Sequence, residues 1–135
     1  MSTDHLSTQP WVLTQVTVVI SKSDLDPEEV TRRLSLTPTD VLQPGTDARF
    51  PDGEWRLKFG DRISRDFSQQ LDAALLALEP QRSTLHALAN EGCEVRLTAY
   101  GFADHNSTIE LATRDVERVS QLGIPFELIP NINSR

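Results

Sequence analysis

The chain has 135 residues, which matches one domain by the usual range of about 100–200 residues. Hydrophobic residues make up 38% and charged residues 24%, which is typical of a folded globular protein and excludes global disorder. Acidic residues outnumber basic ones 20 to 13, and the net charge of −7 excludes the domain-wide basic surface of a nucleic-acid-binding protein.

The sequence shows neither a membrane-spanning segment nor a targeting segment. Its longest apolar runs are far short of the ~20 residues needed to cross a bilayer. The N-terminal residues lack the basic and apolar regions of a secretory signal, so we expect a cytoplasmic protein that does not bind membranes. Cys93 is the only cysteine, which excludes an intrachain disulfide, and we expect it to be a small buried hydrophobic residue.

The first half of the chain predicts strands on both sides of a helix. Residues 14–21 are dense in β-branched side chains, which favours a strand. A weaker signal places a short strand around 40–43. Residues 54–59 alternate between apolar and charged side chains, as in a half-buried antiparallel strand. Trp55 shares the apolar face of that strand, so we expect it in the core.

A capping pattern marks the start of the intervening helix. Asp26 fits the N-cap, Pro27 the first helical position and Glu29 the third, as in a capping box. The helix then continues to Leu34. A metal site is the alternative interpretation of the acidic side chains in this stretch, which are Asp24, Asp26, Glu28 and Glu29.

The second half begins with a long helical pattern over residues 67–91. Pro80 interrupts it, and since proline clashes with the preceding turn, the helix must kink or break there. A strong strand follows over residues 94–102.

The C-terminal part predicts a strand, a helix and a strand. Residues 108–112 favour a short strand that pairs back on the preceding strand as a hairpin. Thr113 fits the N-cap of a short helix that Gly123 closes, and residues 125–129 favour a last strand.

Helices interspersed with hairpins predict the α+β class. We expect a ferredoxin-like two-layer sandwich, with a mixed, mostly antiparallel sheet, helices on one face and an added C-terminal strand-helix-strand portion. The single domain covers residues 13–130, between flexible tails over residues 1–12 and 131–135.

The chain resembles a bacterial domain-of-unknown-function family, numbered four-two-seven-nine, over about residues 14–130. The resemblance rests on segments in the expected order, which are ISKSDLDPEE at 20–29, LSLTPT at 34–39, GEWRL at 53–57, LEP at 78–80 and EVRL at 94–97. It implies a small, stand-alone protein and carries over no activity and no catalytic residues. His105 departs from the small or acidic residues expected in the polar loop, so chemistry in that loop is not implied as a family trait.

The polar loop after the strand at 94–102 is a candidate catalytic site. Asp104, His105 and Glu110 place a histidine beside carboxylates, a pattern that can supply a general base near neutral pH. The alternative is a solvated turn, because Asp and Asn favour turns. No metal-ligand spacing and no cofactor motif is present, so we predict neither a metal nor a cofactor.

The sheet face turned away from the helices is the second candidate site. The alternation places on it Gln15, Thr17, Val19, Arg56, Lys58, Arg96, Thr98, Tyr100, Phe102, Glu110 and Ile129. Arg and aromatic residues are the usual anchors of interfaces. The candidate binding residues are Arg56, Lys58, Arg96, Tyr100 and Phe102, and an ordinary solvated sheet face is the alternative.

Three hypotheses of function follow. The leading one is a non-catalytic protein-interaction module that binds an unknown protein partner or a second copy of the chain. The alternative is a small protein that binds an anionic ligand through its basic side chains. The third is a hydrolase or isomerase centred on residues 104–110.

Overall fold

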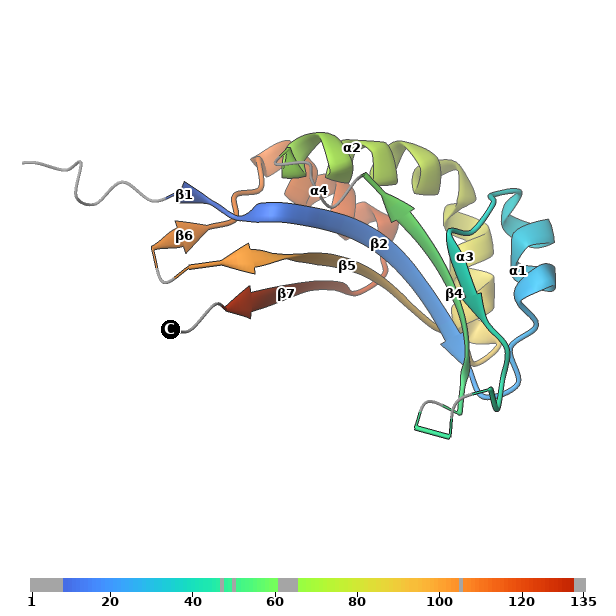
Figure 1. Ribbon diagram of the computed structural model, residues 1–135. Coiled ribbons are helices and arrows are strands. Elements are labelled where there is room, and N and C mark those ends of the chain that lie inside the picture. The colour runs from blue at the N-terminus through green and yellow to red at the C-terminus, as the bar shows by residue number, and fades with distance from the viewer. Residues whose placement is uncertain (1–8, 47, 50, 61–65, 105, 133–135) are drawn as a thin grey trace, which may run out of the picture.

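The computed structural model describes all residues except 1–8, 47, 50, 61–65, 105 and 133–135. Its centre is a five-stranded sheet with the strand order β3-β4-β2-β5-β7 (Figure 1). The strands are β2 (Val12–Lys22), β3 (Asp40–Leu42), β4 (Gly53–Phe59), β5 (Glu94–Ala103) and β7 (Phe126–Ile132). Neighbouring strands are antiparallel except for β5 and β7, which are parallel. The sheet is therefore mixed and mostly antiparallel, as predicted.

The helices connect these strands by crossing one face of the sheet. They are α1 (Pro27–Leu34), α2 (Phe67–Leu78), α3 (Arg82–Asn90) and α4 (Thr113–Leu122). α1 joins β2 to β3 with β4 between them, and α2 with α3 joins β4 to β5 with β2 between them, which makes two interleaved split βαβ units. α4 adds β7 beside β5. The α+β class is confirmed, and the ferredoxin-like assignment stays a prediction with which this strand order agrees.

The hydrophobic core lies between the helices and one face of the sheet. Figure 1 shows the sheet as a curved layer with the helices on its convex side. Side chains of the sheet that are buried in this core include Val16, Val18, Ile20, Trp55, Leu97 and Ala99. Trp55 is fully buried, as predicted, and its indole Nε1 donates a hydrogen bond of 3.0 Å to Thr31 Oγ1 in α1. The strand alternation then sends every second side chain to the concave face.

The start of α1 confirms the predicted cap. Asp26 Oδ1 accepts a hydrogen bond of 3.1 Å from the backbone N–H of Glu28, and Pro27 begins the helix. Leu25 and Val30 are buried on either side of this turn, as a hydrophobic staple requires. Glu29 forms an ion pair with Arg32. Capping and local pairing thus account for Asp26 and Glu29, two of the four acidic side chains in this stretch.

Pro80 breaks the long helical pattern, as predicted. α2 ends at Leu78, and the single 3₁₀ turn η2 (Glu79–Gln81) leads into α3. The apolar stripe continues across the break, because Leu78 and Leu85 are both fully buried in the same core. The two helices therefore cover one continuous surface.

The predicted hairpin over residues 108–112 is wrong. β6 (Ser107–Thr108) is two residues long and pairs in parallel with β1 (Gln9–Pro10) instead of folding back on β5. The N-terminal segment competes for these backbone groups, since the Trp11 N–H donates a hydrogen bond of 3.0 Å to the Thr108 carbonyl. Trp11 itself is buried beside Gly101, where an added Cβ would lie 3.0 Å from its ring.

Further boundaries differ from those expected. Ala112, not Thr113, is the N-cap of α4, since Thr113 already has helical geometry, and no side chain caps this end. The closing role of Gly123 is confirmed by its left-handed φ of 77°. Strands include Gln9–Pro10 and extend to Ile132, because backbone pairing continues into the expected tails. The rest of those tails, 1–8 and 133–135, lies outside the described residues.

Within the described part of the chain, none of the helices is long and apolar enough to cross a membrane. The cytoplasmic location stays a prediction.

Candidate functional site

The side chains of the concave face lie in rows, because the pairing of β2 with its two neighbours is regular from Val16 to Ser21 and includes Gln15 opposite Tyr100. Val19 in β2 pairs with Arg56 in β4 on one side and with Arg96 in β5 on the other. The next row runs through Lys58, Thr17, Thr98 and Glu127, and the row after it through Gln15, Tyr100 and Ile129. The two arginines therefore flank one valine.

These rows enclose a groove of about 410 Å³. All residues predicted for the concave face line this groove except Phe102 and Glu110. Glu127 from β7 also lines the groove, although it was not predicted. Val19, Thr17 and Thr98 are almost fully buried, with 6%, 8% and 8% of their surface exposed, and form its floor. Longer side chains form the walls. The alternation in β2, β4 and β5 thus predicted the face, while the role of these residues in binding stays a prediction.

Two of the basic side chains in the groove have carboxylate partners near the surface. Arg56 Nε lies 2.8 Å from Glu54 Oε1, and Lys58 Nζ lies 3.0 Å from Asp40 Oδ2. Ion pairs at this exposure contribute little to stability, about 0–1 kcal/mol, because solvent screens them. These cations are therefore available to exchange one carboxylate for another.

Arg96 is held less completely. Its nearest carboxylate oxygens, Glu94 Oε1 and Glu127 Oε1, both lie at 3.4 Å, the long end of the hydrogen-bond range. Its Nε is buried and has no hydrogen-bond partner among the described residues. Since its contacts with Glu94 and Glu127 are long, this guanidinium keeps capacity to form shorter hydrogen bonds with an anion.

The aromatic end of the face is fixed in position. The Tyr100 hydroxyl accepts a hydrogen bond of 2.9 Å from Asn131 Nδ2. The Tyr100 and Phe102 rings meet edge to face, with centroids 6.0 Å apart and planes at 75°. Phe102 thus supports Tyr100 from outside the groove. Ile129, beside Tyr100 in the register, is 42% exposed.

Two of the candidate catalytic residues, Asp104 and Glu110, do not line this groove. The Asp104 carbonyl accepts hydrogen bonds from the backbone N–H and the hydroxyl of Ser107, as in a tight turn. His105 lies outside the described residues. Glu110 does not reach the sheet face, because β6 does not pair with β5, and it lines a separate cavity of about 560 Å³ near Trp11 and the start of α2. A catalytic role for Asp104, His105 and Glu110 stays a prediction.

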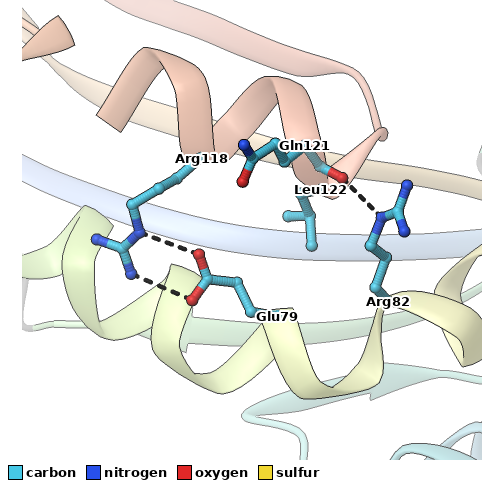
Figure 2. Close-up of a pocket in the computed structure, with 5 residues that line it drawn as sticks. All are labelled: Glu79, Arg82, Arg118, Gln121 and Leu122. Carbon is cyan, nitrogen blue, oxygen red and sulfur yellow. Dashed lines mark hydrogen bonds and ion pairs between the residues drawn. The ribbon is translucent and has the colours of Figure 1, made fainter. Parts of the chain in front are cut away.

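A second cavity, of about 400 Å³, lies beside an ion-pair cluster that the sequence analysis did not find (Figure 2). Arg118 in α4 binds Glu79 with two nitrogens, at 3.0 and 3.4 Å, and Asp72 at 2.8 Å. These hydrogen bonds raise the pKa of Arg118. Arg82 Nε donates a hydrogen bond of 2.7 Å to the Gln121 carbonyl at the other end of the cavity. The cluster ties α4 to α2 and η2, so its evident role is structural.

Cys93 is half-buried and packs against the core, close to its predicted role. Burial raises the pKa of its thiol, which lowers the share of reactive thiolate. Nearby, Arg33 makes two hydrogen bonds of 2.8 Å to Glu91, which lowers the pKa of that carboxyl. In the part of the chain that the structure describes, no group of three or more His, Cys, Asp or Glu side chains is placed to hold a metal ion.

The comparisons with known proteins agree with the resemblance seen in the sequence. The chain matches the family described as Domain of unknown function (DUF4279) over residues 13–133. Neither a curated protein nor a solved structure matches it. The match covers nearly all of the fold, including every strand that lines the groove. The chain therefore belongs to the DUF4279 family.

Proposed function

We propose that this chain is a non-catalytic protein-interaction module whose groove on the concave sheet face receives an extended segment of a partner protein. The observation that carries the proposal is the groove itself. Arginine, lysine and tyrosine side chains form the walls of this groove, and small side chains form its floor. The groove lies on the face of the sheet opposite the helices (Figure 1). Arginine and tyrosine are enriched in the centres of protein interfaces.

Charge complementarity favours a partner segment that carries a carboxylate. Arg56, Lys58 and Arg96 line the groove, against the single lining carboxylate of Glu127. The partners of Arg56 and Lys58 outside the groove are weakly held surface carboxylates, which an incoming carboxylate can replace. The net charge of −7 on the whole chain disfavours general binding of acidic segments, whereas the residues that line this groove carry more basic than acidic groups.

The proposal is tested with a random heptapeptide library displayed on phage and selected against the full chain. Thr17→Phe fills the floor of the groove, and Val116→Phe is the matched control, since Val116 is exposed on α4. Selected peptides should bind the native chain and the control but lose at least tenfold in affinity for Thr17→Phe. Circular dichroism confirms that both variants fold. The proposal would be overturned if no peptide were enriched. It would also be overturned if the selected peptides bound Thr17→Phe as tightly as the native chain.

A small anionic ligand is the second candidate function. Its specific support is the volume of about 410 Å³, which lies within the roughly 300–1,000 Å³ of small-molecule sites, together with the long carboxylate contacts of Arg96. A panel of organic and inorganic anions should then raise the melting temperature of the native chain. Unchanged thermal shifts in Arg56→Ala and Arg96→Ala would exclude these arginines as the binding groups.

A further inference from the structure

On the basis of the proposed function, we infer that the groove selects its partner segment by the positions of one acidic and one apolar side chain. An acidic group lies over Arg56 and Arg96 at one end, and an apolar side chain lies against Tyr100 and Ile129 at the other. The groove therefore selects segments in which these two groups are separated by about 13 Å.

The acidic end follows from the strand register. Arg56 and Arg96 pair with the same residue, Val19, from opposite sides. Adjacent strands are about 4.8 Å apart, so the two arginine backbones lie roughly 10 Å from each other. Val19 is short and almost fully buried, so it leaves space between the two arginine side chains. A carboxylate between them can accept hydrogen bonds from both sides.

Arg96 is the stronger of the two ligands for this carboxylate. Its Nε has no hydrogen-bond partner among the described residues, and its two carboxylate contacts are long. Because both contacts are long, an external carboxylate can form a shorter hydrogen bond with the exposed part of this guanidinium. Arg56 must share its Nε with Glu54 at 2.8 Å, so it contributes less.

The apolar end lies farther along β5. Tyr100 is four residues beyond Arg96 in the same extended strand, which is roughly 13 Å at about 3.3 Å per residue. Its ring is held by Phe102 and its hydroxyl by Asn131, so it presents a fixed apolar surface. Ile129 is exposed beside it. Burying an apolar side chain here gains the hydrophobic contribution without reorganising the face.

The middle of the groove separates these two ends. Thr17 and Thr98 form its floor, with Lys58 on one side and Glu127 on the other. Their opposite charges balance, so this row favours neither an anion nor an apolar group. An extended peptide with its acidic and apolar residues four positions apart matches both ends at once.

Four acetylated, amidated pentapeptides test this inference on the ¹⁵N-labelled full chain by chemical-shift titration. The first reads Glu-Thr-Val-Thr-Phe, the second has Gln for Glu, the third has Ser for Phe, and the fourth has both changes. The first should bind at least tenfold more tightly than the second or the third. Arg56→Gln should reduce the advantage of Glu over Gln, and Ile129→Ser the advantage of Phe over Ser. The control Arg32→Gln, on exposed α1 surface, should change neither.

The outcomes separate the inference from the proposed function. If the first three peptides bind with equal affinity and the chemical-shift changes are confined to the sheet face, the inferred selectivity is wrong. The proposed binding face would then still hold. Shifts that map to the helical side, or no shifts with any of the four peptides, would overturn both.

Discussion

Replacing Arg118 tests how α4 is attached to the rest of the domain. Its side chain is 16% exposed and contacts three carboxylates, from Asp72, Glu79 and Asp115. Arg118→Met keeps much of the aliphatic length but removes every one of these contacts. Since α4 carries the chain from β5 into β7, loosening it also loosens the strand that supplies Glu127 and Ile129 to the groove.

The expected loss is worked from the exposure of each partner. The Asp72 and Glu79 side chains are 46% and 38% exposed, so each ion pair contributes about 0.2–1 kcal/mol after screening. Asp115 is buried, and its Oδ1 has no hydrogen-bond partner among the described residues and only the ion pair with Arg118 at 3.5 Å. Leaving such a buried group unpaired adds about 1–3 kcal/mol. We expect Arg118→Met to lower the free energy of unfolding by about 1.5–5 kcal/mol.

Urea denaturation measures this difference. With a slope of about 2 kcal/mol per molar in urea, the midpoint should fall by about 1–2.5 M. Arg114→Met, an exposed position in the same helix, is the matched control and should change the midpoint little. Asp115→Asn in the Arg118→Met background should recover part of the loss, because it removes the stranded charge. A midpoint for Arg118→Met equal to that of Arg114→Met would refute the reasoning.

Three further predictions concern the fold. Gly123→Ala should lower the melting temperature, because φ is 77° there and an added Cβ would lie 2.8 Å from the His86 ring; a melting temperature unchanged in thermal denaturation would contradict this. Trp55→Phe should reduce stability by about 1–3 kcal/mol in urea, since it leaves Thr31 Oγ1 without its indole donor and creates a small cavity; an unchanged midpoint would show that this hydrogen bond is dispensable. Cys93 should react with iodoacetamide at pH 8 more slowly than a cysteine in a short peptide, because burial raises its pKa; equal rates in the folded chain would contradict the burial.

The concave face could be predicted from the sequence because it depends on local alternation. A strand alternates its side chains between two faces, so Arg56 and Lys58 had to lie opposite Trp55 once the apolar face was known to be buried. The cap at Asp26 and the break at Pro80 are equally local, since each depends on neighbours within one helical turn.

What the sequence analysis missed depends on contacts between distant segments. Arg118 meets Asp72 across 46 positions and Glu79 across 39, and the spacing of charges within one helix does not reveal such pairs. β6 pairs with β1 across most of the chain, and a strand of two residues has no alternation to detect. The hairpin prediction was wrong for that reason, and it placed Glu110 on the wrong surface.

The groove itself needed the register as well as the alternation. Arg56 and Arg96 lie on either side of Val19 because β2 pairs with β4 and β5 in a particular register. The alternation within each strand does not specify that register. Glu127 was missed although the alternation indicates it, since Glu127 lies two residues before Ile129 in the same strand and therefore shares its face.

The most direct test of the binding face uses a peptide from the heptapeptide selection that carries a nitroxide spin label. The label broadens the amide resonances of the labelled full chain that lie near the bound peptide. We expect broadening at Val19, Thr98 and Tyr100 on the concave face, with the resonances of α1 and α4 unaffected. Broadening centred on α1 or α4, with the resonances of the concave face sharp, would contradict it.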